Sequence, residues 1–324
     1  MASVHQKPLG SGFGMRSEPS DILAGVDLSG KTCIVTGGYS GLGLETSKAL
    51  SGAGAQIVVP ARRPEAAEDA LVGVANTEIA VMDLGDLASA KAFGDSFVAS
   101  GRPLDILINN AAVMACPETR SGPDNWEAQF ATNHYGHFAM VCALEPALKA
   151  AGAKGGARVV SLSSTGHHLS PIRHGDLHFN TGYDKWLAYG QAKTANSLFA
   201  VELDRRGEAD GIRAFAVHPG GIMTPLQRHL PKEEMIAFGW MDGEGNVNPM
   251  FKSPTQGAST SLWAATSPQL DGIGGVYCED CDIAQLDSEG TARYNQVKPY
   301  AVDSEEAKKL WALSVDATRA DGFG

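Results

Sequence analysis

Residues 32–43 read Thr-Cys-Ile-Val-Thr-Gly-Gly-Tyr-Ser-Gly-Leu-Gly, and this stretch decides the fold. A short run of apolar and β-branched residues leads directly into a turn with glycines at Gly37, Gly41 and Gly43. Glycines allow a tight turn and a close approach of the backbone to a ligand, and the N–H groups that open the following helix favour a phosphate. The stretch therefore predicts a dinucleotide-binding turn after the first strand of an α/β domain.

Short apolar runs alternate with helical patterns along the rest of the chain. The expected strands are Thr32–Thr36, Gln56–Pro60, Ile79–Met82, Ile106–Asn109, Arg158–Ser163, Arg213–Val217 and Gly275–Tyr277. The expected helices are Leu42–Ser51, Ala88–Ala99, Asn125–Ala150, Leu187–Arg206, Thr255–Ala265 and Ser304–Ala320. Strands that are apolar throughout and separated by helices indicate a parallel sheet covered on both faces. We expect one doubly wound, Rossmann-type α/β domain over residues 26–324, with a seven-stranded parallel sheet, after a loosely ordered polar extension over residues 1–25.

Composition excludes several classes of function. The 324 residues contain 26 Lys and Arg against 37 Asp and Glu, a net charge of −11, which argues against nucleic-acid or anionic membrane partners. Five scattered cysteines do not form a disulfide framework or a usual metal-ligand set. No apolar run reaches the ~18 residues of a membrane span, and residues 1–20 lack the apolar core of a signal peptide. We expect a cytoplasmic protein without a metal site.

The end of the second expected strand indicates which nucleotide binds. It reads Val58-Val59-Pro60-Ala61-Arg62-Arg63 and has no carboxylate for a ribose 2′-hydroxyl. An arginine fork matches a 2′-phosphate, so Arg62 favours NADP(H) over NAD(H). The alternative is that Arg62 and Arg63 form an ordinary solvated loop.

The segment Tyr189-Gly190-Gln191-Ala192-Lys193, together with the glycine turn, resembles the short-chain dehydrogenase/reductase family over nearly the whole of Gly30–Cys281. Further motifs stand in the family's order: Asp83-Leu84, Asn109-Asn110-Ala111-Ala112, Asn133 within Asn133–Phe138, Ser163-Ser164, and Pro219–Thr224. Ala112 departs from the family's glycine and could narrow the cofactor channel. The Asn133–Phe138 segment, the long gap between Ser164 and Tyr189, and the residues after Lys193 resemble the retinol-dehydrogenase and WW-domain-oxidoreductase branch, which largely prefers NADP.

The resemblance implies a role for each motif. It implies the catalytic residues Asn133, Ser164, Tyr189 and Lys193. It implies cofactor binding by Gly37, Tyr39, Ser40, Gly41, Leu42, Gly43, Arg62, Asp83, Leu84, Asn110, Ala111, Tyr189, Lys193, Pro219, Gly220, Ile222 and Thr224. Asp83 would meet the adenine ring, Lys193 would hold the nicotinamide ribose, and Pro219–Thr224 would cover the carboxamide. Asn133 would hold a water that links Lys193 to solvent.

The chemistry of Tyr189 and Lys193 suits proton transfer. The two residues are four positions apart in a helical stretch and share one face. A phenol with a pKa near ~10 is a poor base, and a neighbouring ammonium together with an oxidised nicotinamide would lower that pKa. Tyr189 would take the alcohol proton during oxidation and return it during reduction, and Ser164 would stabilise the charge on the substrate oxygen. Each motif alone has an ordinary structural reading, and their joint order favours the enzyme.

An irregular segment over residues 225–255 resembles the family's substrate lid. Its apolar side chains are Leu226, Leu230, Met235, Ile236, Phe238, Trp240, Met241, Met250 and Phe251. This character predicts a medium-sized hydrophobic or aromatic alcohol or carbonyl substrate. The alternative is that the lid packs on its own body or on a second subunit. Family members commonly pair through helices beside the active site, so we expect a homodimer or homotetramer.

Histidines flank several of these motifs. We expect His167, His168, His174 and His178 to be loop residues, because their spacing fits no usual ligand set. We expect His134 and His137 to pack or form hydrogen bonds within their helix. The leading function is an NADP(H)-dependent alcohol dehydrogenase or carbonyl reductase. The alternatives are reduction of an activated carbon–carbon double bond and a catalytically idle nucleotide-binding scaffold.

Overall fold

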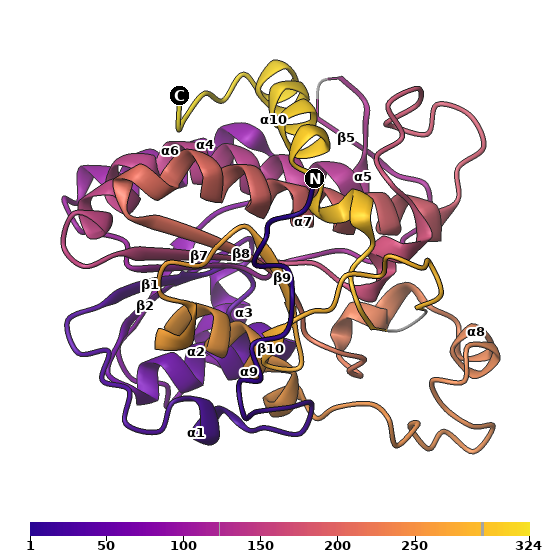
Figure 1. The fold of residues 1–324 in the computed structure, drawn as a ribbon, viewed down its shortest axis with the longest axis horizontal. Coiled ribbons are helices and arrows are strands. Elements are labelled where there is room, and N and C mark those ends of the chain that lie inside the picture. Colours follow the sequence, from indigo (N-terminus) through magenta and orange to yellow (C-terminus); the bar gives the residue numbers. More distant parts are fainter. Residues whose placement is uncertain (123, 293–294) are drawn as a thin grey trace.

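An eight-stranded sheet forms the centre of the molecule, in the order β10-β9-β8-β7-β4-β1-β2-β3 (Figure 1). The computed structural model describes residues 1–122, 124–292 and 295–324. The strands are β1 (Thr32–Val35), β2 (Gln56–Ala61), β3 (Thr77–Val81), β4 (Ile106–Asn109), β7 (Ala157–Leu162), β8 (Ile212–His218), β9 (Val276–Glu279) and β10 (Asp282–Ile283). All seven expected strands are present and run parallel. The doubly wound α/β prediction is confirmed.

The sheet differs from the prediction at one edge, where β10 adds an eighth strand antiparallel to β9. Asp280 and Cys281 join the two strands with φ angles of +48° and +61°. Two consecutive left-handed residues make the tight hairpin turn whose twist matches the strands it joins. Neither residue is a glycine, so the glycine that usually marks such a turn is absent from the sequence.

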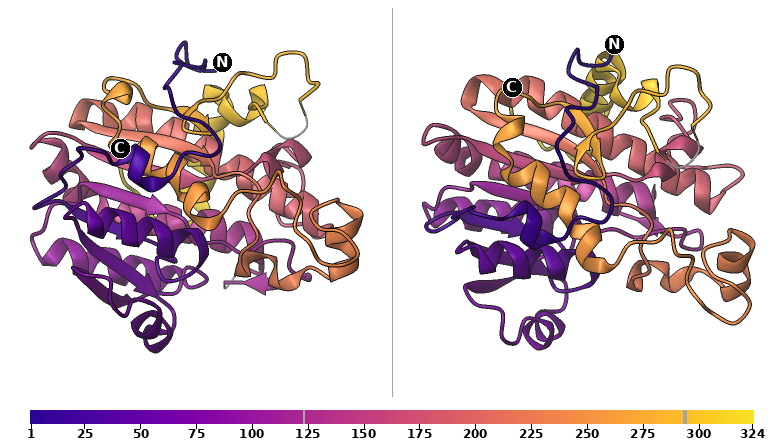
Figure 2. Two further views of the ribbon diagram at one scale, coloured as in Figure 1. Left: turned by 90° about the horizontal axis from the view of Figure 1, so that it is seen from below. Right: turned by 60° about the horizontal axis from the view of Figure 1, so that its bottom comes forward.

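Helices cover both faces of the sheet (Figure 1, Figure 2). One face packs against α1 (Pro19–Ile22), α2 (Gly41–Gly52) and α9 (Pro254–Thr266), and the other against α4 (Leu87–Ala99), α6 (Gly136–Gly152) and α7 (Lys185–Gly207). In β1, Cys33 and Val35 pack in the core on the side of α1, α2 and α9, and Ile34 packs in the core on the side of α4, α6 and α7. Burial on both faces explains why this strand is apolar throughout.

The remaining helical elements are shorter or lie outside the two layers next to the sheet. They are α3 (Pro64–Ala70), α8 (Lys232–Ala237), α10 (Ser304–Thr318), and the short turns η2 (Thr165–Leu169), η3 (Glu208–Asp210), η4 (Pro225–His229), η5 (Pro268–Leu270) and η6 (Pro299–Val302). Across the described ranges, the helices are all too short or too polar to cross a membrane.

The single helix expected over Asn125–Ala150 is divided into several elements. The chain instead forms the hairpin strands β5 (Arg120–Ser121) and β6 (Trp126–Glu127), then α5 (Ala128–Phe130), a π-helical turn η1 (Ala131–Tyr135), and α6. The Glu127 carboxylate accepts hydrogen bonds from the backbone N–H groups of Gln129 and Phe130, at 2.9 and 2.7 Å. This capping starts the helix at Ala128, three residues later than expected.

The N-terminal extension is fastened to the sheet edge, where a loosely ordered segment was expected. The Gln6 side chain donates to the carbonyl oxygens of Tyr277 and Ala284 and accepts from the Tyr277 N–H. The Asp282 carboxylate accepts three backbone N–H groups from residues 9–11. Hydrogen bonds from Gln6 to the backbone of β9 and from residues 9–11 to Asp282 of β10 therefore hold the extension along this edge.

The C-terminal helix α10 packs across α6 and α7 (Figure 1). The Trp311 ring lies 4.9 Å from that of Phe138 and stacks on Phe199 at 5.8 Å. The His134 Nε2 atom lies 2.7 Å from the Ser314 hydroxyl. The helix α10 thus covers part of α6 and α7, and the homo-oligomer stays a prediction.

Candidate functional site

The predicted site residues gather at the carboxyl edge of the sheet, where β1, β4, β7 and β8 end. Thr36, directly after β1, is the hub of this region. Its hydroxyl accepts hydrogen bonds from the N–H groups of Asn110 and Ala111 at 2.9 and 3.0 Å, and Asn110 Nδ2 donates to the Thr36 carbonyl at 2.8 Å. The glycine turn and the segment after β4 are therefore held as one unit.

The glycine turn has the shape that a dinucleotide needs. Gly37 and Gly41 have φ angles of +64° and +51°, which favour glycine. A Cβ atom on Gly43 would overlap the Gly37 carbonyl oxygen, so only glycine lets α2 begin this close to the turn. Ser40 precedes α2 and its hydroxyl does not cap the helix, so the side chain is exposed at the helix N-terminus. The residues present fit a pyrophosphate at this position.

The segment after β8 closes over the glycine turn. A Cβ atom on Gly41 would lie 3.4 Å from the Thr224 side chain, and one on Gly257 would meet both Leu42 and Ile222. Predicted cofactor residues from the first and sixth expected strands are thereby brought together. Pro219 and Gly220 lie between β8 and this contact and are half-buried.

Lys252 packs against the segment that follows β8. Its side chain packs against Gly220, and its Nζ atom forms a 2.6 Å ion pair with Asp280 although the lysine side chain is 3% exposed. The Lys252 N–H also donates to the Gly221 carbonyl at 2.8 Å. Sequence reasoning missed Lys252 because a lysine in an irregular segment gives no signal of burial.

The residues predicted to meet the adenosine half lie at the ends of β2 and β3. Arg62 is exposed, and among the described residues no hydrogen bond or ion pair engages its guanidinium. Asp83 is half-buried, and its Oδ1 accepts from the Gly85 N–H at 2.9 Å. Leu84 is buried, and Tyr39 packs against the core beside α2. The strands β2 and β3 run parallel to β1, so Arg62, Asp83 and Leu84 lie at the same edge of the sheet as the glycine turn, which contains Tyr39.

Tyr189 and Lys193 lie together on α7, as their spacing predicts. The Lys193 Nζ atom lies 5.6 Å from the centre of the Tyr189 ring and donates a 2.8 Å hydrogen bond to the Leu162 carbonyl at the end of β7. Tyr189 is 5% exposed and Lys193 is 3% exposed. The Ser164 hydroxyl accepts from the Gly166 N–H at 3.0 Å, so its own proton is free for another acceptor.

Burial shifts the pKa values of both residues of this pair. Burial raises the pKa of Tyr189 to about 12, and the hydrogen bond with Ser164 acts in the opposite direction. Burial lowers the pKa of Lys193 to about 7. The expected lowering of the Tyr189 pKa by Lys193 together with an oxidised nicotinamide stays a prediction, because it depends on the bound cofactor.

Asn133 lies in the π-helical turn, and its side chain has a different task from the expected one. Its Oδ1 accepts from the Val113 N–H and its Nδ2 donates to the Val113 carbonyl, both at 2.9 Å. The amide thus pairs with the backbone after β4 like a neighbouring strand. These two bonds fix the plane of the Asn133 amide, and the predicted role of Asn133 in holding a water beside Lys193 stays a prediction.

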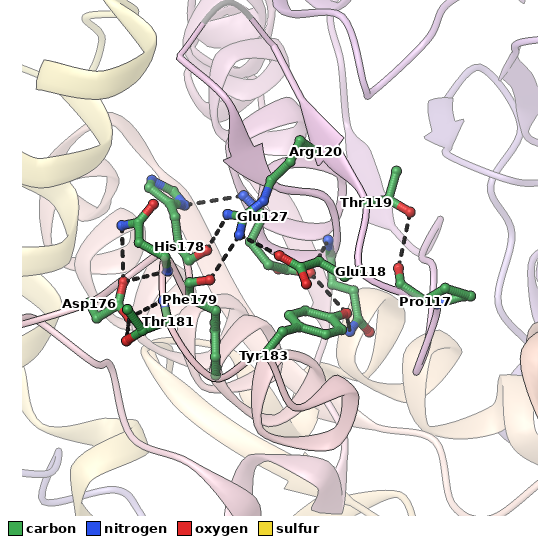
Figure 3. Close-up of polar contacts among 12 residues, drawn as sticks. Pro117, Glu118, Thr119, Arg120, Glu127, Asp176, His178, Phe179, Thr181 and Tyr183 are labelled. Carbon is green, nitrogen blue, oxygen red and sulfur yellow. Dashed lines mark hydrogen bonds and ion pairs between the residues drawn. The ribbon is translucent and has the colours of Figure 1, made fainter.

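The long loop between Ser164 and Tyr189 is tied to the hairpin β5–β6. Arg120 donates to the carbonyl oxygens of His178 and Phe179 at 2.5 and 2.8 Å (Figure 3). The Tyr183 hydroxyl donates to the Cys116 carbonyl at 2.9 Å. Figure 3 shows Tyr183 beside Glu127, whose Oε1 lies 3.5 Å from the same hydroxyl. The part of this loop that leads into α7 is thereby fixed against the hairpin β5–β6 and Cys116.

Gln129 fixes the wall next to Tyr189. Its Oε1 accepts from the Ala115 N–H at 2.8 Å and its Nε2 donates to the Lys185 carbonyl at 2.9 Å. Ala115 has a φ of +46°, an uncommon angle for alanine that these contacts hold. Met114 and Ala115 pack with Tyr189 and with Leu230 of the lid. No sequence signal distinguishes Gln129 from other glutamines.

The lid segment over residues 225–255 packs beside Tyr189 through aromatic side chains. The Trp186 ring lies 6.3 Å from Tyr189, 5.3 Å from Phe238 and 6.0 Å from Trp240. Leu226, Leu230, Met235 and Trp240 pack around Met114, Ala115 and Tyr189. This segment thus packs on its own body beside Tyr189, and its role as a substrate lid stays a prediction. Phe238 and Met250 remain 48% and 68% exposed.

The histidines and cysteines serve the structure of the chain. Burial lowers the pKa of His167 to about 3, and its ring accepts from the Lys298 N–H at 3.1 Å. His168 lies between the carbonyl oxygens of Ala292 and Gln296. His174 pairs with Glu306 of α10. All five cysteines are free and buried.

Comparison with known proteins identifies the family. The short chain dehydrogenase family model matches residues 31–235. The chain is 44% identical over 304 residues to "Probable oxidoreductase" of Streptomyces lividans, covering 91% of this chain and 100% of that protein. It is 34% identical over 297 residues to "Retinol dehydrogenase 12" of Homo sapiens, covering 90% of this chain and 87% of that protein. It is also 35% identical over 293 residues to "Short-chain dehydrogenase/reductase prx1" of Penicillium roqueforti, covering 89% and 85%.

Solved structures have the same architecture. An uncharacterized protein from Mycobacterium paratuberculosis aligns with a TM-score of 0.71 at 31% identity, covering 95% of this chain and 99% of that chain. The Pseudomonas aeruginosa RhlG/NADP active-site complex aligns with a TM-score of 0.61 at 24% identity, covering 78% and 96%, and shows the shared fold. The chain belongs to the short-chain dehydrogenase/reductase family, in its retinol-dehydrogenase-like branch, and is an oxidoreductase of a family that binds a nicotinamide dinucleotide.

Proposed function

We propose that this protein is an NADP(H)-dependent oxidoreductase that interconverts a hydrophobic alcohol and its carbonyl compound. The observation that carries the proposal is the placement of Tyr189, Lys193 and Ser164 at the sheet edge that also carries the glycine turn. Proton donors and a dinucleotide turn at one edge suit hydride transfer to a carbonyl carbon.

The chain's own residues divide the work of carbonyl reduction. A bound nicotinamide dinucleotide would supply the hydride. The Ser164 hydroxyl, whose oxygen accepts from Gly166, directs its proton to the substrate oxygen and stabilises the charge that develops there. Tyr189 gives its proton to the same oxygen. Burial, which raises the pKa of Tyr189, keeps the phenol protonated until charge develops on the substrate oxygen, and the same side chain would take the proton back in the oxidation direction.

Two features support the choice of cofactor and substrate class. Arg62 follows β2 with an exposed guanidinium, where a 2′-phosphate would be recognised. The wall beside Tyr189 consists of Met114, Trp186, Leu230 and Trp240. Aromatic and sulfur-containing side chains bind apolar, ring-containing molecules well. We infer a medium-sized hydrophobic or aromatic aldehyde or ketone as substrate.

The test is a panel of aliphatic, aromatic and polycyclic carbonyl compounds, each with NADPH and with NADH. Absorbance of the reduced nucleotide measures turnover, and an enone in the panel is analysed for its product. We expect turnover with bulky carbonyls and NADPH, and an allylic alcohol from the enone. A saturated ketone would assign double-bond reduction, and nucleotide binding without turnover of any compound would favour a nucleotide-binding scaffold.

A further inference from the structure

His137 connects the cofactor turn to the π-helical turn. It lies in α6 and is 3% exposed. Its Nδ1 lies 3.0 Å from the Asn133 carbonyl oxygen and its Nε2 lies 2.9 Å from the Thr36 hydroxyl. One buried ring thus joins the residue after β1 to the turn that precedes α6.

The hydrogen-bond partners fix the tautomer of the ring. A carbonyl oxygen only accepts, so Nδ1 of His137 carries the proton and donates it to Asn133. The Thr36 oxygen already accepts from the N–H groups of Asn110 and Ala111. Its own proton has two acceptors within reach, His137 Nε2 at 2.9 Å and the Ile108 carbonyl at 3.4 Å. The shorter contact places this proton on the bond to His137.

The ring stays neutral throughout the working range of pH. Burial lowers the pKa of His137 to about 4, and the positive charge of Lys193 on α7 acts in the same direction. The other titratable group that faces the ring is His134, whose pKa burial lowers to about 3. His137 therefore contributes geometry to the site and no change of charge.

Both partners of His137 lie next to groups that the proposed reaction uses. The Thr36 hydroxyl holds Asn110 and Ala111, which form the cofactor side of the site. The Asn133 carbonyl belongs to a π-helical turn, where the regular helix bonding is displaced, and the Asn133 side chain is occupied by Val113. A carbonyl oxygen has two lone pairs, of which His137 uses one.

We propose that His137 is a positioning residue for this reaction, whose imidazole sets the Thr36 hydroxyl beside the cofactor segment and orients the Asn133 carbonyl as the acceptor for a water through which Lys193 exchanges protons with solvent. The proposal rests on the proposed function. Lys193 Nζ has three protons, and the described residues provide a single acceptor for them, the Leu162 carbonyl. A water held by the oriented Asn133 carbonyl would take a proton from Lys193 or return one, and pass it to solvent.

Two isosteric substitutions separate the two arms of the ring. In His137→Asn the amide nitrogen stands where Nδ1 was and keeps the bond to Asn133 while the Thr36 arm is lost. In His137→Gln the amide oxygen stands where Nε2 was and keeps the bond to Thr36 while the Asn133 arm is lost. Circular dichroism and thermal unfolding verify that each variant is folded, and NADPH affinity and the pH profile of kcat are measured on both.

We expect His137→Asn to weaken NADPH binding about tenfold, as for one lost buried hydrogen bond, and to keep the pH profile of the wild type. We expect His137→Gln to bind NADPH within about twofold of the wild type, to lower kcat about tenfold and to shift the profile. General loosening of the core would change both properties in both variants. That result, or two variants that match the wild type, would overturn the proposal. Failure of the wild type to bind either nucleotide would instead overturn the proposed function.

Discussion

Trp186 Nε1 donates a 2.7 Å hydrogen bond to the Glu234 carboxylate, which joins the first turn of α7 to the lid helix α8. The same carboxylate forms a 2.6 Å ion pair with Lys185. Trp186 stands three residues before Tyr189, so one carboxylate holds the lid against the helix that carries the predicted proton donor. Charge-assisted hydrogen bonds are stronger than neutral ones, and this contact stabilises the closed lid.

Replacing Glu234 is expected to loosen the lid while leaving the proton donor in place. We expect Glu234→Ala to raise KM for a bulky carbonyl about tenfold, from the loss of about 1.5 kcal/mol of hydrogen bonding, with kcat changed less than threefold. Steady-state kinetics measure both constants. Glu233→Ala, on the exposed side of the same helix, is the matched control and should behave as the wild type. Equal KM values for the two variants would show that the contact does not hold the lid.

Gly43 is expected to be indispensable for nucleotide binding. A Cβ atom there would overlap the Gly37 carbonyl and Asn110 Nδ2, whereas one on Gly52, at the other end of α2, meets nothing within 4 Å. We expect Gly43→Ala to weaken NADPH binding at least about a hundredfold, because the added Cβ atom would overlap the Gly37 carbonyl oxygen and force the phosphate-binding turn to move. Gly52→Ala should bind normally. Titration of nucleotide fluorescence compares them, and tight binding by Gly43→Ala would contradict the assigned turn.

The choice between NADPH and NADH is expected to depend on Arg62. Its guanidinium is exposed, so removing it costs no packing. We expect Arg62→Ala to weaken NADPH binding about tenfold to a hundredfold, since an arginine–phosphate pair is worth about 1.5–3 kcal/mol, and to leave NADH binding unchanged. Lys91→Ala, in the distant helix α4, serves as control. A wild type that binds NADH more tightly than NADPH would contradict the cofactor assignment.

The buried histidines are expected to make the fold sensitive to acid. Burial lowers the pKa of His134 to about 3, well below its ordinary value near 6.5. The unfolded chain then binds more protons than the folded one between these values, so the free energy of unfolding rises with pH up to about 6.5 and is lost as the pH falls below it. Glu279, whose pKa burial raises to about 7, acts in the opposite direction.

Comparison of one variant with the wild type isolates the histidine from such opposing groups. His134→Gln keeps a nitrogen donor for Ser314 and removes the titration. We expect the wild type to lose about 2 kcal/mol more stability than this variant between pH 6.5 and pH 5, at about 1.36 kcal/mol per pH unit. Urea unfolding at the two pH values measures the difference. Parallel losses in both proteins would show that His134 is not buried in its neutral form.

The fold follows from the sequence because its signals are local. Seven short apolar runs, most of them buried on both faces, and a glycine turn after the first of them specify a parallel sheet. The edge strand β10 was missed since Asp280 and Cys281 adopt left-handed angles without glycine. The ordering of residues 1–17 was missed because it depends on Gln6 and Asp282, whose partners lie more than 250 positions apart in the chain.

The sequence predicts which residues gather at the candidate site better than it predicts their pKa values and hydrogen-bond partners. Tyr189 and Lys193 share a helix face because they are four residues apart, which sequence alone states. The pKa of each group depends on desolvation by the lid and the sheet, which sequence does not contain. The contacts of Thr36, His137 and Gln129 join segments through single hydrogen bonds, and such residues have no pattern in the sequence.

The central claim is that Tyr189 protonates the carbonyl oxygen, and Tyr189→Phe tests it most directly because it removes one hydroxyl and keeps the ring against Trp186. The measurement is single-turnover oxidation of enzyme-bound NADPH by the best carbonyl of the panel, with NADPH affinity determined on the same samples. We predict unchanged affinity and a rate lowered by about 10²–10⁴-fold, the usual contribution of general acid catalysis. Equal rates in the two proteins would show that Tyr189 does not protonate the carbonyl oxygen.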